Sequence, residues 1–146
     1  MEVPLYIWIF QKALTQRLAL WALISLILGA LLFLPVGDFW GGLAFQFLGW
    51  ALVYLGVAGF GYLNFRRHQA KLSVEQKKAV ALAETDKVIL LLQGGSILSA
   101  VCILGGLALI IFMQARGSFW AGAGTGIALQ GAFLFFFSRS HARKLQ

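Results

Sequence analysis

Few side chains in this 146-residue chain are suited to chemistry, and they do not form a catalytic set. Its acidic residues are Glu2, Asp38, Glu75, Glu84 and Asp86. A Ser-His-acid triad cannot be assembled from these positions, because no acid on either side has the partners that a triad needs. The glycine-rich Gly122–Gly126 follows no strand and contains no lysine, so it is not a phosphate-binding loop. We predict no catalytic residue and no enzyme activity.

The two histidines are the weak candidates for binding a ligand. His68 and His141 each follow a long apolar run, and paired histidines can hold haem, a pigment or a metal. Neither has a Cys, Asp or Glu at the spacing that metal sites use, so we predict no metal site. Polar residues at a membrane surface are the simpler interpretation, and the sequence leaves any cofactor unknown.

The single cysteine, Cys102, lies inside an apolar run. One cysteine excludes a disulfide framework and a Cys-x-x-Cys redox pair. It therefore also argues against the four-helix thiol oxidases, and we interpret Cys102 as a small packing residue.

The elements that must position these residues are four runs without any Asp, Glu, Lys, Arg or His: Leu18–Leu34, Phe39–Leu63, Val88–Met113 and Phe119–Phe137. A helix crosses a bilayer with roughly 20 mostly apolar residues. Charged residues make up only 12% of the chain, against about 25% in soluble domains. We predict an all-α, integral membrane four-helix bundle in a single domain, residues 1–146, with spans at about 18–34, 39–64, 88–113 and 118–138.

The basic residues predict the orientation. Of the 12 Lys and Arg residues, only Arg116 lies between the third and fourth runs, and none lies between the first and second. By the positive-inside rule, both termini and the central loop are expected in the cytoplasm, in a bacterial cytoplasmic membrane. The net charge of +7 then needs no nucleic-acid partner, and none is predicted.

The segments beside the spans also carry helix patterns. Residues 4–16 are predicted to form a short amino-terminal interfacial helix, with Trp8 at headgroup level and polar residues such as Gln11 beside it. The alternative is one long helix from Pro4 to Leu34. Ser73 and Gln76 have capping-box spacing, so the third helix is expected to begin in the cytoplasm near residue 74.

The chain contains an internal repeat. Gly37-Asp38-Phe39-Trp40 precedes the second span and Gly117-Ser118-Phe119-Trp120 precedes the fourth, and His68 and His141 follow these spans. Gln46 and Gln130 occupy similar places within them. We interpret the chain as two tandem helical hairpins related by an approximate two-fold axis along the membrane normal.

Several of these motifs are similar to those of a family of uncharacterised small bacterial membrane proteins with four transmembrane helices. They are the Gly-Ser-Phe-Trp start, Gly122-x-Gly124-x-Gly126, Gln130-Gly131-Ala132-Phe133-Leu134 and His141-Ala142-Arg143, with Phe39-Trp40-Gly41 and Gln46 in the second span. The resemblance implies an architecture and no mechanism. The family's fourth span ends with an acidic residue where this chain has Ser138-Arg139.

Small residues form a row on each later span, and helices in a bilayer associate through such close-packing faces. The residues predicted to pack against other helices are Gly42, Gly49, Gly56, Gly95, Ser99, Gly106, Gly122 and Gly126. Gln46 and Gln130 share these faces. We expect both amides to point into the bundle, opposite each other, and to bond to protein or to the polar head of a ligand.

Two functions fit this sequence. The leading hypothesis is a structural or accessory subunit of a membrane complex, or a homo-oligomer, whose partners are the lipid bilayer and other membrane subunits or further copies. The alternative is a binding or transport module that takes an apolar ligand, such as a lipid, quinone or pigment, between its two hairpins.

Overall fold

Four long helices make up the computed structural model of the chain, which describes residues 3–35 and 37–145, without the side chains of 3–5, 68–70 and 114. They are α1 (Val3–Leu31), α2 (Asp38–Lys71), α3 (Val74–Met113) and α4 (Ser118–Ala142), with a short 3₁₀ helix, η1 (Gln114–Arg116), before α4. All four are long and apolar enough to cross a membrane. The prediction of an all-α, four-helix fold is confirmed.

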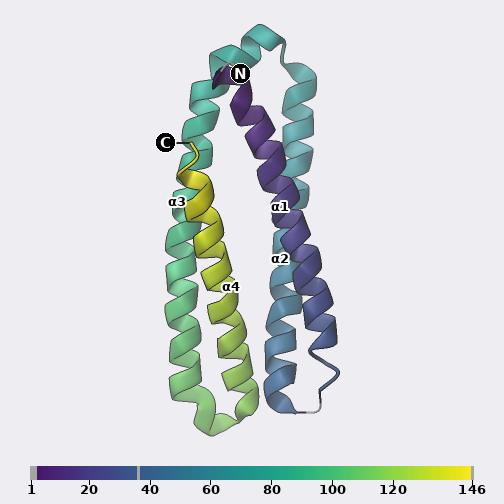
Figure 1. The fold of residues 1–146 in the computed structure, drawn as a ribbon, viewed down its shortest axis with the longest axis vertical. Helices are drawn as coiled ribbons and strands as arrows, with labels where there is room; N and C mark the ends of the chain where they lie inside the picture. Colours follow the sequence, from purple (N-terminus) through teal and green to yellow (C-terminus); the bar gives the residue numbers. More distant parts are fainter. Residues whose placement is uncertain (1–2, 36, 146) are drawn as a thin grey trace.

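The helices form two hairpins, α1–α2 and α3–α4 (Figure 1). The hairpins meet where the first turns of α2 and α4 cross, and they separate towards the opposite end of the bundle. We call this opposite end, where α2 leads into α3 through Leu72 and Ser73, the open end. There α2 and α3 do not pack along their length, and the beginning of α1 contacts α3 instead.

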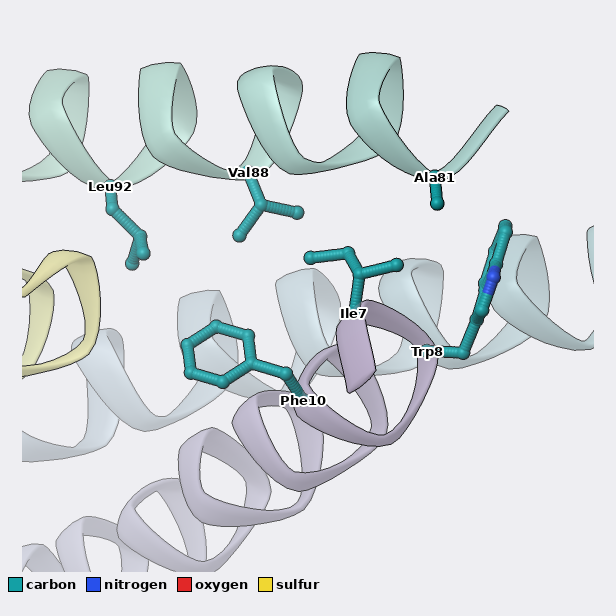
Figure 2. Packing of buried hydrophobic residues seen from close by; sticks show 6 residues of the cluster. All are labelled: Ile7, Trp8, Phe10, Ala81, Val88 and Leu92. Carbon is teal, nitrogen blue, oxygen red and sulfur yellow. The ribbon is translucent and has the colours of Figure 1, made fainter. Parts of the chain in front are cut away.

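Helix α1 is continuous from Val3 to Leu31. The prediction of a separate short helix at residues 4–16 is therefore wrong, and the alternative of one long helix describes the chain. Residues 5–28 contain neither Gly nor Pro, so nothing interrupts the backbone ladder. The first turns pack inside the protein, in a cluster shown in Figure 2: Ile7, Trp8, Phe10, Ala81, Val88 and Leu92.

Helix α3 begins at Val74, next to the expected capping box. The backbone N–H of Gln76 donates to the Ser73 hydroxyl at 3.3 Å, and the backbone N–H of Ser73 donates to the Gln76 amide oxygen at 3.0 Å. Two amides that would lack helical partners are thereby satisfied. The helix then continues for 40 residues to Met113.

The crossing of α2 and α4 is reciprocal. A Cβ on Gly42 would collide with the carbonyl oxygen of Phe119, and a Cβ on Gly122 would collide with the carbonyl oxygen of Phe39. The two contacts match each other in the motifs Phe39–Gly42 and Phe119–Gly122. Glycine of the first motif meets phenylalanine of the second, and glycine of the second meets phenylalanine of the first. Only glycine allows two helix backbones to approach this closely.

Each of these two helices also begins in the same way. Gly37 and Gly117 precede them with φ of 146° and 129°, a region that L side chains rarely adopt. The rings of the following Phe–Trp pair are edge-to-face in both, with interplanar angles of 87° in α2 and 89° in α4.

Candidate functional site

A cavity of about 450 Å³ opens where the two hairpins separate, and all four helices line it. We call it the cleft. Its walls are α2 from Val57 to Phe65 and α3 from Glu84 to Gly95, and α1 and α4 contribute residues between them. The cleft is therefore a consequence of the divergence of α2 and α3, which the beginning of α1 spans only near the open end.

The part of the cleft nearest the open end is polar. Gln11, Asn64, Glu84 and Lys87 line it. The Lys87 ammonium donates to one oxygen of Glu84 at 2.9 Å, and the Gln11 amide donates to the other at 3.4 Å. The lysine and the glutamate among the lining residues are thus paired with each other.

The remainder of the cleft is mostly apolar. Leu18, Val57, Leu91, Leu92 and Leu134 line it, together with the hydroxyl residues Thr15 and Ser138. The cleft thus changes from polar to apolar along the helix axes. From Glu84 to Gly95 along α3 this distance is about 16 Å, at 1.5 Å per residue.

Trp8 lines the cleft and contains a buried donor without a partner. Its side chain is only 4% exposed, and its ring lies 6.4 Å from that of Phe65. Within the described part of the chain, the indole Nε1 has no hydrogen-bond partner. A buried N–H without an acceptor costs about 1–3 kcal/mol, and the nitrogen itself is inaccessible to solvent, so it does not face the open space of the cleft.

The two intramembrane glutamines of the sequence analysis have different environments. Gln130 is buried; its amide oxygen accepts from the indole N–H of Trp21 at 3.2 Å, and its amide nitrogen donates to the Ser25 hydroxyl at 3.4 Å. The Tyr54 hydroxyl donates to the Gln130 backbone oxygen at 3.5 Å. Gln130 thus joins α4 to both helices of the first hairpin.

Gln46 is half-buried and packs its Cβ against Gly126. Among the described residues its amide makes no hydrogen bond. The expectation that the two glutamines lie opposite each other is wrong, because the contacts at the crossing place Gln46 opposite Gly126 and leave Gln130 one helical turn further along α4.

Most of the predicted small-residue positions lie at helix contacts. A Cβ on Gly95 would meet the Ser138 hydroxyl, and one on Gly106 would meet the α4 backbone at Gly124. Ser99 is fully buried. Gly126 lies against Gln46, and the Gly42–Gly122 contact is described above.

Gly49 and Gly56 are the exceptions, because both are exposed and nothing lies within 4 Å of an added Cβ. The prediction that they contact another helix of the chain is wrong. Beyond the crossing, the buried face of α2 is a different one, formed by Ala51, Tyr54 and Ala58. The row that Gly42 begins therefore continues outside the bundle.

His141 is buried, and both ring nitrogens are engaged. Nδ1 lies 2.7 Å from the Phe137 carbonyl oxygen, and Nε2 lies 2.9 Å from the Arg17 guanidinium. Because a guanidinium only donates, Nε2 accepts and Nδ1 carries the proton. The side chain of His68 lies outside the described residues. No group of three or more His, Cys, Asp or Glu in the described part of the chain is placed to hold a metal.

Residues 17–138 match the family described as "Family of unknown function (DUF6992)". The chain belongs to this family. The match includes the α2, α3 and α4 walls of the cleft but not the first turns of α1, where Trp8 and Gln11 lie. Comparison with curated proteins gave no match, and neither did comparison with solved structures.

The cleft as a whole was not predicted from the sequence. The sequence predicts Gln11 on an interfacial helix at the membrane surface, whereas the structure places it in the cleft. A usable pattern is that Gln11, Thr15 and Leu18 on α1 and Glu84, Lys87 and Leu91 on α3 lie at helical spacing and change from polar to apolar.

Proposed function

We propose that this is an integral membrane protein with both termini and the open end of the bundle in the cytoplasm. The outer faces support this, because large apolar side chains such as Leu52, Leu104 and Phe112 are 66%, 68% and 77% exposed. A soluble protein rarely exposes such extensive apolar surface. The distribution of Lys and Arg, with Arg116 alone on the other side, supports the orientation.

Within this setting, we propose that the protein binds one amphipathic, lipid-like molecule in the cleft. The observation that supports this is the cleft itself, whose volume of about 450 Å³ lies in the range of small-molecule sites, about 300–1,000 Å³. Its polar part is at the open end, near the expected membrane surface, and its apolar part extends towards the membrane centre. A lipid in one leaflet is oriented in the same way, with its polar head at the membrane surface and its apolar tail towards the membrane centre.

A pair of adjacent leucines tests this proposal. Leu91 lines the cleft and Leu90 does not, and their exposures are similar, 74% and 70%. We expect Leu91→Trp to displace the ligand that copurifies with the protein, and Leu90→Trp to leave it bound. Native mass spectrometry of the detergent-purified chain measures the retained ligand. Equal retention by both variants, or no ligand on the wild-type protein, would contradict the proposal.

A second candidate function is that of a subunit in a larger membrane complex or a homo-oligomer. One observation favours it: Gly49 and Gly56 lie on an exposed face of α2, with nothing within 4 Å of an added Cβ. Small residues at such a face let a second helix backbone approach closely. The chain itself does not use this face.

The test is Gly49→Leu, with Gly42→Leu as the contrasting variant. If α2 packs against another chain, Gly49→Leu should reduce the assembled fraction in size-exclusion chromatography with light scattering and leave the folded monomer intact. Gly42→Leu should disrupt folding instead. A wild-type chain that is monomeric in mild detergent would eliminate the homo-oligomer.

A further inference from the structure

We infer that the molecule bound in the cleft has a second polar group, a hydroxyl or carbonyl oxygen in the middle of its hydrocarbon chain, which hydrogen-bonds to the hydroxyl of Ser138. This inference rests on the proposed ligand-binding function and narrows the chemical class of the ligand. Two observations support it. The Ser138 hydroxyl has no partner among the described residues, and it lies in the part of the cleft that is otherwise mostly apolar.

Ser138 is a buried residue of the cleft whose hydroxyl is unpaired. It lines the cleft, and only 2% of the residue is exposed. Among the described residues that are not exposed, the only side-chain nitrogen or oxygen that is both unpartnered and inaccessible is Trp8 Nε1. The Ser138 hydroxyl has no partner there either, so its oxygen is accessible, and the space that it faces is the cleft.

Other hydroxyls within the helices have a different arrangement. A serine or threonine in a helix can donate to a carbonyl oxygen one turn earlier. The residues that do so here are Thr15, Thr85, Ser96, Ser99, Thr125 and Ser140. Ser138 points towards α3 instead, since its Oγ lies 2.8 Å from the position of a Cβ added to Gly95. Its hydroxyl is thus available to a bound molecule.

The place of Ser138 determines how far the second polar group lies from the head of the molecule. Ser138 lies opposite Gly95 on α3, and Lys87 and Glu84 of the same helix line the polar part of the cleft. The rise along α3 to Gly95 is about 12 Å from Lys87 and about 16 Å from Glu84, at 1.5 Å per residue. A ligand with its head in the polar part therefore meets Ser138 with the middle of its chain.

The chemistry of a hydroxyl determines which groups fit beside Ser138. A serine hydroxyl both donates and accepts, so either a hydroxyl or a carbonyl oxygen of the ligand satisfies it. A plain hydrocarbon chain would cover the Ser138 hydroxyl and leave it without a partner, which costs free energy. The cleft should therefore prefer a chain with an oxygen at this depth over a chain without one.

The test uses fatty acids that share one head and one chain length, so that differences between them report the mid-chain group alone. They are stearic acid and its two derivatives with a hydroxyl or a keto group on the twelfth carbon. Thermophoresis measures their affinities for the full chain in mild detergent. For at least one derivative, the affinity relative to stearic acid should be about fivefold higher in the wild type than in Ser138→Ala, the effect of one hydrogen bond. The derivative that shows this effect identifies the group as hydroxyl or carbonyl.

Thr15→Val is the matched control. Thr15 also lines the cleft, but its hydroxyl already donates to the Gln11 carbonyl oxygen at 3.0 Å. This variant should keep the wild-type preference for the oxygenated chain. Stearic acid with a hydroxyl on its second carbon, next to the head, should bind the wild type and Ser138→Ala equally. Thermal melting without ligand should show no loss of stability in Ser138→Ala, because the hydroxyl that it removes makes no hydrogen bond with a described residue.

The ligand that copurifies with the wild type gives a check that needs no variant. Released from the protein and fragmented by tandem mass spectrometry, it should have an oxygen in the middle of its chain. A copurified ligand with a plain hydrocarbon tail would contradict the inference and leave the proposed function standing.

The binding outcomes also separate the inference from the proposed function. If Leu91→Trp abolishes fatty-acid binding while the wild type and Ser138→Ala have the same preference, the cleft binds the ligand but the inference is wrong. An equal loss of preference in Thr15→Val also overturns it. If no fatty acid binds and no ligand copurifies, the proposed function and the inference both fail.

Discussion

Gln130 is one of the buried side chains through which the second hairpin bonds to the first. It bonds to Trp21 and Ser25 of α1, and His141, nearer the open end, bonds to Arg17. Gln130→Leu would remove an acceptor and leave the half-buried Trp21 N–H without one. We expect the free energy of unfolding, measured by denaturation in mixed micelles, to fall by about 1–2 kcal/mol.

Gln46→Leu is the matched control. The Gln46 amide makes no hydrogen bond among the described residues, and its Cβ, which leucine retains, makes the contact with Gly126. We expect a change below about 0.5 kcal/mol, as for replacements that break no interaction. Equal losses for the two variants would mean that the Gln130 bonds add nothing to stability.

The crossing of α2 and α4 gives a second matched pair in neighbouring glycines. Gly42→Ala would place a methyl group against the backbone of Phe119 and Ala123, whereas an added Cβ on Gly41 meets nothing within 4 Å. Overpacking costs about 1–3 kcal/mol, while alanine in open space favours the helix by up to about 1 kcal/mol. Gly42→Ala should therefore lower the melting temperature and Gly41→Ala should not. The reverse order would show that the helices do not cross here.

At the scale of one element, the capping box of α3 is expected to act locally. Ser73→Ala removes the acceptor for the Gln76 N–H, a loss of about 1 kcal/mol. Amides in the first turn of α3, residues 74–77, should then exchange with solvent about fivefold faster in hydrogen-exchange mass spectrometry, and those near Leu92 should not change.

Ser118→Ala is the control for the capping variant. The α4 N-cap, Gly117, makes no side-chain hydrogen bond, so exchange in the first turn of α4 should be unaffected by this change. Unchanged exchange at residues 74–77 in Ser73→Ala would contradict the prediction.

The helices themselves were largely predictable, because long apolar runs and the Gly37 and Gly117 turns specify them locally. The beginning of α1 was not, since Trp8 and Ile7 are equally suited to a membrane surface and to a protein core. These residues lie in a protein core because the hairpins diverge, which leaves Val88 and Leu92 of α3 open to contact with α1. This depends on packing at the crossing, far away in sequence.

For the whole molecule, the proposed orientation gives a direct prediction. In a Cys102→Ala background, Ser118→Cys should react with a membrane-impermeant maleimide on intact cells, and Ser73→Cys should react only after the cells are opened. The reason is that Arg116 is the one basic residue on the Ser118 side. Labelling of position 73 on intact cells would reverse the orientation.

The cleft was beyond what the sequence specifies, because it depends on where helices fail to touch. Gly42 and Gly49 have the same residue type and lie seven positions apart, yet one is at a backbone contact and the other is exposed. Likewise, nothing in the sequence distinguishes Trp8, whose N–H has no partner among the described residues, from Trp21, whose N–H is bonded to Gln130. Each outcome follows from the angle between two hairpins, which residue patterns do not encode.

The glycine crossing fixes the angle between the two hairpins at one end of the molecule. The two hairpins meet at Gly42 and Gly122 and again where Gln130 and His141 of α4 bond to α1, and the cleft lies between α2 and α3. Asn64 is about 33 Å along α2 from Gly42, at 1.5 Å per residue. A tilt of about 5° at the crossing would move it by about 3 Å over this length. We therefore expect an added methyl group at Gly42 or Gly122 to change the width of the cleft, although the crossing lies far from it.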